Sequence, residues 1–304
     1  MHIRFWADTG GIGDAVATTW IAEGLRFRGV KVDYYANNHN HRQVLQMLGQ
    51  VVDPRSEQNT APEHERGIRL GAAFPAYQQI ELRIDRGKSR RVDVWWPRVD
   101  NQPPAPARPP FLAPKPESEW AQRAAQDRRA GRRKLALLFP FSEYSVRTWP
   151  MAYWLDLAWG LEAEGVSTAA FYPSGRGDGG LGFPFAYWGH SWRQIAAWMQ
   201  HADLVIGNDS GPTHLAATIG TPTLGIMGPT SNIFTHAENA RELRVTADQV
   251  SCVGCHFAGE RGYRKACDYQ CRALLMLDPG EVLSQCVNAM DTLPNLAVRE
   301  VARA

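Results

Sequence analysis

The amino-acid sequence predicts an α/β protein built on parallel β-sheets that helices cover on both faces. Short apolar segments alternate with segments of helical periodicity at the start of the chain and again after residue 134. A proline-rich segment separates the two series. The chain has 304 residues, which suits two domains of roughly 100 to 200 residues each. We therefore expect one domain over residues 1–117 and a second over residues 118–304.

The first 50 residues follow the order strand, glycine loop, helix, strand, helix. "HIRFWA" is a short apolar segment, "DTGGIGD" interrupts it, and "AVATTWIAEGLRFRG" has helical spacing and ends in a glycine. "VKVDYYAN" then predicts a second strand. Residues 100–116 contain seven prolines, too many for a helix or a central strand, so we expect an extended linker or an edge segment there.

The second domain is expected to begin with a charged helix in "SEWAQRAAQDRRAGRR", after which "KLALLFPF" restarts the alternation with a strand. Further helices are expected at about residues 150–164, in "SWRQIAAWMQ" and after Pro212. Strands are expected in "VSTAAFYP", "DLVIGN" and "TPTLGIMG". This alternation predicts a second parallel sheet with helices on both faces.

The composition is that of an ordinary folded protein, with 44% hydrophobic residues, 21% charged residues and a net charge of +2. These values exclude a disordered chain and do not favour nucleic acid as a partner. Basic residues gather in "RIDRGKSRR" and "RRAGRRK", which we expect to be solvated. In one patch they would instead favour an acidic acceptor such as a phosphorylated lipid, or nucleic acid.

The N-terminus shows no basic region followed by an apolar stretch of signal-peptide length. No segment approaches about 18 uninterrupted apolar residues, the length of a membrane-spanning helix. We therefore expect a cytoplasmic protein without a transmembrane segment.

Residues 202–230, "ADLVIGNDSGPTHLAATIGTPTLGIMGPT", combine apolar sequence with five glycines and three prolines. The pattern predicts a buried strand ending near Asp209, then a helix whose first turn holds Pro212 and His214. Ligands of parallel sheets bind at the carboxyl ends of the strands, and helix N-termini attract phosphate. The next strand ends in a similar loop, so the two loops could hold a diphosphate. The alternative is that Asp209 only caps the helix and His214 packs against its neighbours.

The segment "NDSGPTHLAATIGTPTLGIMGPT" resembles the signature of the heptosyltransferase-like glycosyltransferases, carbohydrate-enzyme family nine. That signature reads Asp-x-Gly-x-x-His-x-Ala-Ala, followed by a Gly-Pro-Thr loop. "GGIGDAVATTWIAEGLR" resembles the N-terminal Gly-Asp loop of the family, and "SVRTWPMAYWLDLA" resembles its Lys-x-Trp-Pro element. Residues 51–117 show little that can be aligned.

The resemblance implies the GT-B architecture, two Rossmann-like domains that face each other across a cleft, with the donor bound mainly by the C-terminal domain and the acceptor by the N-terminal one. It implies an inverting glycosyltransferase that moves a sugar, a heptose, from a nucleoside diphosphate, with ADP favoured. The acceptor could be a protein, a lipopolysaccharide core or another glycan, and the chain could form a homo-oligomer. A second hypothesis is a catalytically inactive protein that keeps the fold and binds nucleotide or metal.

The resemblance also assigns site residues. Asp14 matches the general base, in a loop on the acceptor side with Gly11 and Gly13, although it could instead be only a helix N-cap. Arg147 stands where the family more often has lysine, and either cation can neutralise a leaving phosphate. The other candidates for donor binding lie in the loops after the strands: Ser142, Glu143, Asp209, Ser210, Gly211, Pro212, Thr213, His214, Gly228, Pro229 and Thr230.

Two other chemistries fit the sequence less well. The "GGIG" loop is similar to a dinucleotide-binding loop, but the third glycine position is Val16, and Asp14 would place a carboxylate where a pyrophosphate should lie. Glycosyltransferases of the other common architecture hold a divalent ion with an Asp-x-Asp pair, and this sequence contains no such pair. We therefore expect catalysis without a metal ion.

Four of the five cysteines fall in "CVGCHFAGERGYRKACDYQC", as Cys252, Cys255, Cys267 and Cys271. Four thiolates close a tetrahedral site and leave no open position, which predicts one structural metal ion. Zinc is the usual ion, and the resemblance to autotransporter heptosyltransferases, which carry cysteine-bound iron, keeps iron open. His256 could replace one ligand, and free or disulfide-linked cysteines are the alternative. Cys286 is expected to be a buried helix residue.

Overall fold

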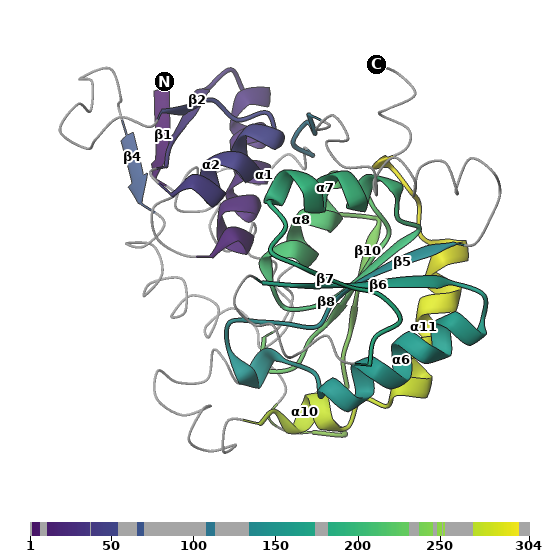
Figure 1. Ribbon diagram of the computed structural model, residues 1–304. Coiled ribbons are helices and arrows are strands. Elements are labelled where there is room, and N and C mark those ends of the chain that lie inside the picture. Colours follow the sequence, from purple (N-terminus) through teal and green to yellow (C-terminus); the bar gives the residue numbers. More distant parts are fainter. Residues whose placement is uncertain are drawn as a thin grey trace. The chain divides into compact units, whose positions relative to one another are not determined.

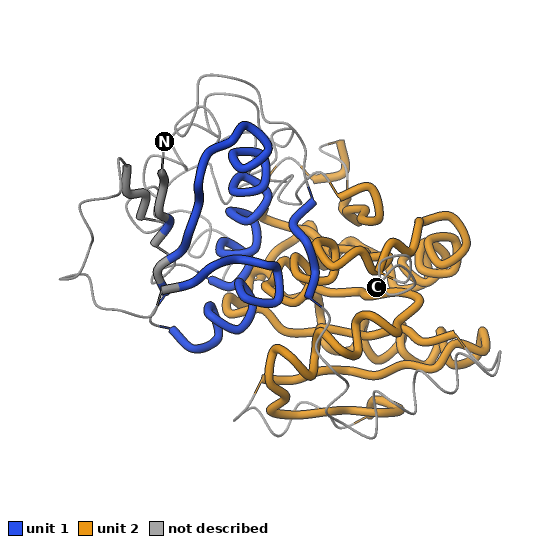
Figure 2. Tube along the Cα trace, turned by 90° about the horizontal axis from the view of Figure 1, so that it is seen from above, with its two compact units in different colours: residues 1–112, 232–236 blue, residues 113–231, 237–304 orange. Residues whose placement is uncertain are grey.

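The structure is a computed structural model of the chain. Its described residues form two compact units, the first mainly within residues 1–112 and the second mainly within residues 113–304 (Figure 2). The boundary that the sequence predicts after residue 117 lies outside the described residues. These are residues 2–6, 11–36, 38–53, 66–69, 108–112, 134–173, 182–230, 237–245, 248–250, 252 and 270–297.

The first unit contains a four-stranded sheet in which all neighbouring strands are parallel. The strand order is β3-β2-β1-β4. This sheet and its helices confirm the strand, helix, strand, helix order predicted for the first 50 residues. The elements are β1 (His2–Trp6), α1 (Ile12–Phe27), β2 (Lys31–Tyr35), α2 (His39–Met47), β3 (Val52–Asp53) and β4 (Arg66–Arg69) (Figure 1).

Helix α1 begins at Ile12, earlier than the sequence predicts at Ala15. Gly11 is the N-cap, and the carboxylate of Asp14 accepts a hydrogen bond from the Gly11 N–H at 3.0 Å. This contact satisfies an N–H group at the helix start, and the helix dipole also favours a negative charge there. The predicted glycine at the other end is confirmed, because Gly29 has a φ of +77° and lets the chain leave the helix.

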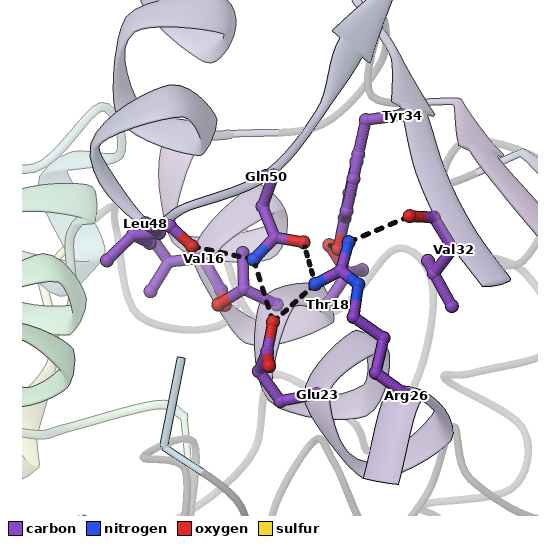
Figure 3. Close-up of polar contacts among 9 residues, drawn as sticks. Val16, Thr18, Glu23, Arg26, Val32, Tyr34, Leu48 and Gln50 are labelled. Atoms are coloured by element: carbon purple, nitrogen blue, oxygen red, sulfur yellow. Dashed lines mark hydrogen bonds and ion pairs between the residues drawn. The ribbon is translucent and has the colours of Figure 1, made fainter. Parts of the chain in front are cut away.

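A polar network fastens α1 to β2 and to the turn after α2 (Figure 3). The guanidinium of Arg26 donates to the Val32 carbonyl and to Gln50 Oε1, both at 2.8 Å, and pairs with Glu23. The side-chain amide of Gln50 donates in turn to the Leu48 carbonyl at 2.6 Å. These bonds satisfy partly buried polar groups and so fix the helix against its strand.

The second unit contains a six-stranded sheet in the order β10-β9-β8-β5-β6-β7, again parallel throughout. The chain leaves β5 toward β6 on one side and leaves β8 toward β9 on the other, so the strand order reverses beside β5. Ligands bind at such a reversal in open parallel sheets. The strands are β5 (Leu135–Phe139), β6 (Ser167–Tyr172), β7 (Ala186–Trp188), β8 (Leu204–Asn208), β9 (Thr223–Ile226) and β10 (Ala240–Leu243).

Helices cover both faces of this sheet (Figure 1). Helices α6 and α11 pack together on one face, and α7 and α8 lie on the other. Large side chains such as Trp149, Trp154 and Leu157 are fully buried in the core, which Cys286 joins as predicted. The predicted α/β fold class is thereby confirmed. The helices are α6 (Met151–Ala163), α7 (Trp192–His201), α8 (Gly211–Ile219), α10 (Arg272–Leu275) and α11 (Pro279–Thr292).

Some elements carry weak sequence signals or none. Strands β7 and β10 are short, and β10 has the sequence "AREL", which lacks the apolar run of a buried strand. Residues 108–112 of the proline-rich segment form neither helix nor strand, as predicted, and the Leu112 N–H donates to the Met47 carbonyl at 2.7 Å. The helix predicted in residues 118–133 lies outside the described residues. Among the helices that the structure describes, none has the length and apolar character needed to cross a membrane.

Candidate functional site

Three loops of the second unit begin at the same edge of its sheet. In the strand register Phe139 pairs with Gly207, and Asn208 pairs with Ile226. The segments that follow β5, β8 and β9 therefore start side by side at the carboxyl ends of the strands. This edge is where parallel sheets bind ligands, and the loops carry most of the residues predicted to hold a donor diphosphate.

A buried carboxylate, Asp209, lies at the centre of this edge. Its side chain is 3% exposed, with Oδ1 3.2 Å from His214 Nε2 and Oδ2 3.3 Å from Arg147 Nη1. Removing a carboxylate from water is costly unless opposite charges and hydrogen bonds surround it. The fold therefore brings together three residues that the sequence predicts separately: Asp209, Arg147 and His214.

The turn that carries Arg147 is held by the tryptophan that follows it. Arg147 ends a short 3₁₀ helix, and its guanidinium lies over the Tyr144 ring, 5.1 Å from the ring centre. The Trp149 backbone N–H donates to Asn208 Oδ1 at 3.0 Å, and its indole N–H donates to the Leu277 carbonyl at 3.0 Å. Because both ends of Trp149 are bonded inside the core, the preceding turn keeps Arg147 at the sheet edge.

The N-terminus of α8 is fastened to the end of β8. Thr213 Oγ1 donates to the Asn208 carbonyl at 2.7 Å and lies 3.3 Å from Ser210 Oγ. Ser210 is the N-cap, and its side chain makes no capping hydrogen bond to the helix. The alternative in which Asp209 merely caps α8 therefore does not describe the structure, since Asp209 precedes the cap and faces Arg147 and His214. A helix N-terminus of this kind favours anions.

The loop after β9 holds Gly228, Pro229 and Thr230, which are all buried. Thr230 Oγ1 has no hydrogen-bond partner among the residues that the structure describes. A side chain at Gly228 would collide with its neighbours, because an added Cβ would lie 2.6 Å from Leu274 Cγ and 2.8 Å from Cys271 Sγ. The loop thus needs glycine at this point of close packing.

Other predicted donor-side residues flank this cluster. Ser142 Oγ donates to the Asp209 carbonyl at 3.2 Å, so the loop after β5 touches the loop after β8. Glu143 is exposed. Gly211 and Pro212 form the first turn of α8, as the sequence predicts.

The residues predicted for the acceptor side lie in the first unit. Gly11 and Gly13 flank the start of α1, and Asp14 is 7% exposed within its first turn. The hydrogen bond from the Gly11 N–H to Asp14 gives this carboxylate a structural role at the helix start. A carboxylate fixed in this way is also oriented for a second task, such as accepting a proton.

Two of the four clustered cysteines are described. Cys271 is buried and Cys252 is half-buried, and both pack against the core of the second unit. Cys255 and Cys267 lie outside the described residues. No group of three or more metal-binding side chains occurs within the described part of the chain, so the four-cysteine site stays a prediction.

Sequence reasoning missed three residues whose polar groups support this edge. Asn208, the last residue of β8, is fully buried and anchors Trp149. The sequence shows Trp149 only as part of the segment "SVRTWP" and does not indicate that its indole supports the Arg147 turn. Arg244 follows β10, whose polar sequence gives no strand signal, and burial lowers the pKa of its guanidinium while the charge of Asp209 acts in the opposite direction.

Comparisons with known proteins find similar sequences for part of this edge. Residues 191–261, which include α8 and the loops around it, match the family model of glycosyltransferase family 9 (heptosyltransferase). Lipopolysaccharide heptosyltransferase 1 of Pseudomonas aeruginosa is 30% identical over 129 residues, 40% of this chain and 34% of that protein. Lipopolysaccharide heptosyltransferase 3 of Escherichia coli is 44% identical over 41 residues, 14% of this chain and 12% of that protein. The aligned segments thus span about a third of the first relative and less of the second.

Solved structures extend the likeness of the fold along the chain. ADP-heptose lipopolysaccharide heptosyltransferase II of E. coli superposes with a TM-score of 0.61 at 15% identity, covering 95% of this chain and 98% of that one. The iron-containing dodecameric glycosyltransferase TibC of enterotoxigenic E. coli has a TM-score of 0.64 at 13% identity, covering 95% of this chain and 76% of that one. The fold is that of the GT-B structures to which the chain is similar. More particularly, residues 191–261 are similar in sequence to glycosyltransferase family 9 (heptosyltransferase).

The packing at Gly207 makes the site edge sensitive to a single methyl group. A Cβ at this position would lie 2.2 Å from Thr213 Oγ1 and 3.1 Å from Phe139 Cβ. We expect Gly207→Ala to displace Thr213 from the Asn208 carbonyl and to lower the free energy of unfolding by about 1–3 kcal/mol. Urea unfolding measures this loss.

Thr213→Ala provides the matched background for that experiment. Since the clashing hydroxyl is absent from Thr213→Ala, adding Gly207→Ala to it should cost less than adding the same change to the wild type. Equal costs in both backgrounds, or a Gly207→Ala protein as stable as the wild type, would show that the close contact does not constrain the edge.

Proposed function

We propose that the chain is an inverting glycosyltransferase that moves a sugar, a heptose, from a nucleoside diphosphate to an acceptor. The observation that carries this proposal is the cluster of Asp209, Arg147 and His214 at the carboxyl edge of the second sheet. Two of these residues lie in the segment that matches the heptosyltransferase family. A cation, a helix N-terminus and hydroxyl groups at one edge are suited to a departing diphosphate.

The donor is proposed to be ADP-heptose. Two similar solved structures support this choice: E. coli heptosyltransferase WaaC with ADP-2-deoxy-2-fluoro heptose and TibC with ADP-D-β-D-heptose. The acceptor is proposed to be a glycan, a lipid-linked sugar such as a lipopolysaccharide core, or a protein. The two relatives are lipopolysaccharide heptosyltransferases, which supports a glycan as the acceptor. The dodecameric TibC supports a homo-oligomer for this chain.

The proposed reaction is a single displacement. The acceptor hydroxyl loses its proton to Asp14 as its oxygen attacks the anomeric carbon, the bond from that carbon to the diphosphate breaks, and the configuration inverts. Arg147 neutralises the charge that develops on the leaving diphosphate, and Asp209 holds Arg147 at the sheet edge. Thr213, Ser210 and the loop at residues 228–230 supply hydroxyl and N–H donors to the same phosphates.

Turnover tests the enzyme against the inactive alternative. The purified chain is incubated with ADP-, GDP- and UDP-linked sugars, with and without candidate acceptors, and nucleoside diphosphate release is measured. Release from one donor supports the glycosyltransferase. Nucleotide binding without release from any donor would favour the catalytically inactive binding protein instead.

Replacing the proposed base should separate chemistry from donor binding. We expect Asp14→Asn to lower the transfer rate by about 10²- to 10⁴-fold, because the amide cannot accept the proton. The affinity for ADP should stay within a few-fold of the wild type. Asp156→Asn, a change at an exposed carboxylate on α6, is the control and should leave both values unchanged. An equal loss of ADP binding in Asp14→Asn would contradict the assignment.

Replacing Arg147, in contrast to replacing Asp14, should weaken the binding of the donor nucleotide. We expect Arg147→Ala to weaken ADP binding by about 10- to 100-fold, since a hydrogen bond to a charged group is lost, and Asp209→Ala to weaken it by releasing Arg147. Arg147→Lys should retain part of the affinity, because lysine keeps the charge without the planar fork. Calorimetric titration with ADP measures these values. Wild-type affinity for ADP in both alanine variants would show that Arg147 and Asp209 do not belong to the donor site.

We also propose that the four clustered cysteines bind one structural metal ion, zinc or iron. The chemistry of the donor set supports this, because four thiolates complete a tetrahedral site. The burial of Cys271 against the loop at Gly228 would then tie the metal-bearing segment to the donor side. The iron in TibC supports iron as the ion.

Elemental analysis of protein purified without added metal tests this site. We expect close to one equivalent of zinc plus iron per chain, with visible absorbance only for iron. Cys267→Ser should lose the metal and lower the unfolding temperature, whereas Cys286→Ala, which changes the cysteine in α11, should keep the full metal content. Less than about half an equivalent in the wild type, together with disulfides seen by mass spectrometry, would contradict the metal site.

A further inference from the structure

A second arginine, Arg244, lies at the same sheet edge as Asp209. In the strand register Ile226 pairs with both Asn208 and Leu243. The next residue along each chain segment is Asp209 after β8, Met227 after β9 and Arg244 after β10. The Met227 N–H donates to the Leu243 carbonyl at 2.9 Å, so the ladder continues to this level. Asp209 and Arg244 therefore begin their loops two strands apart, which is about 10 Å.

The surroundings of Arg244 are those of a largely buried charge. Its side chain is 21% exposed and pairs with Glu242, which is 15% exposed. Burial lowers the pKa of Arg244, and the nearby negative charge of Asp209 opposes that shift. Arg244 therefore pairs with Glu242 and is close enough to Asp209 for the charge of that carboxylate to act on it.

A purely structural role accounts poorly for this arrangement. Buried ion pairs contribute little net stability, because the cost of removing both charges from water offsets their attraction. Apolar residues would serve a short strand at this position at least as well. Two arginines and two carboxylates at a ligand-binding edge instead match the needs of a site that receives an anion, since the carboxylates keep the guanidinium groups charged and oriented before the anion arrives.

We propose that Arg244 is a second cationic ligand of the leaving diphosphate and acts together with Arg147. The ligand's identity rests on the function proposed above, while the anion site itself does not. Each guanidinium has five N–H donors, so Arg244 can hold Glu242 and a phosphate oxygen at once. Glu242 sets the position of Arg244 in the way that Asp209 sets the position of Arg147.

Binding of three probes to the full chain tests this role: inorganic pyrophosphate, ADP and adenosine. We expect Arg244→Ala to weaken pyrophosphate and ADP binding by about 10- to 100-fold and to leave adenosine binding unchanged. Arg241→Ala is the matched control, because Arg241 lies on the same strand but is exposed. It should bind all three probes as the wild type does.

The Glu242→Gln variant separates phosphate binding from a structural ion pair. If Arg244 serves only to neutralise Glu242, breaking the pair from either side should have the same effect. We expect instead that Glu242→Gln weakens pyrophosphate binding far less than Arg244→Ala does, because the cation is still present and has lost only the carboxylate that positions it. Should Arg244→Ala fold poorly, Glu242→Gln/Arg244→Ala removes the unpaired carboxylate and should show the same loss of pyrophosphate binding.

The outcomes distinguish this inference from the proposed function. Arg244→Ala binding pyrophosphate within twofold of Arg241→Ala would overturn the role of Arg244, even if Arg147→Ala weakens binding. A wild-type chain that binds no pyrophosphate would overturn it as well. Pyrophosphate binding that depends on Arg244, in a chain that binds no ADP, would support the anion site and contradict the nucleotide donor.

Discussion

The buried negative charge of Asp209 is the constraint on which the second unit's sheet edge depends. A carboxylate that is 3% exposed loses most of its stabilisation by water, so contacts within the protein must replace it. Arg147 provides its contact from the loop after β5, and His214 provides its contact from helix α8. The positions of this loop and this helix are therefore coupled to one side chain. In the proposed function, this charged cluster at the carboxyl ends of the strands also prepares the edge for an anionic ligand.

The rest of the edge is shaped so that these charged groups can approach each other. Trp149 holds the Arg147 turn through hydrogen bonds to Asn208 and Leu277, which lie far apart in the sequence. Gly207 leaves room for Thr213 to bond the end of β8, which fixes the start of α8. Tight packing of a few small and aromatic residues thus fixes the positions of the charged side chains.

The fold and much of the site could be predicted because their signals are local. The apolar run of β8, the proline in the first turn of α8 and the loop at Gly228 place Asp209 and His214 at one edge without knowledge of tertiary contacts. Arg147 needed the resemblance to a family motif, since no periodicity connects it to Asp209. Arg244 could not be predicted, because β10 reads "AREL" and becomes a strand only through pairing with β9. The start of α1 at Ile12 was also missed, since the contact between Gly11 and Asp14 decides it.

In the proposed reaction, the arginine at position 147 changes how a donor phosphate competes with Asp209 for a cation. A lysine ammonium has three donors around one nitrogen, so a carboxylate and a phosphate share a single point charge. The guanidinium of Arg147 can keep Asp209 on Nη1 while other N–H groups face a ligand. Its stacking on Tyr144 limits rotation of the plane, so the remaining donors point in a fixed direction. The protein therefore does not have to break the contact between Asp209 and Arg147 to bind an anion, and the same buried carboxylate can orient the cation before and after the ligand is bound.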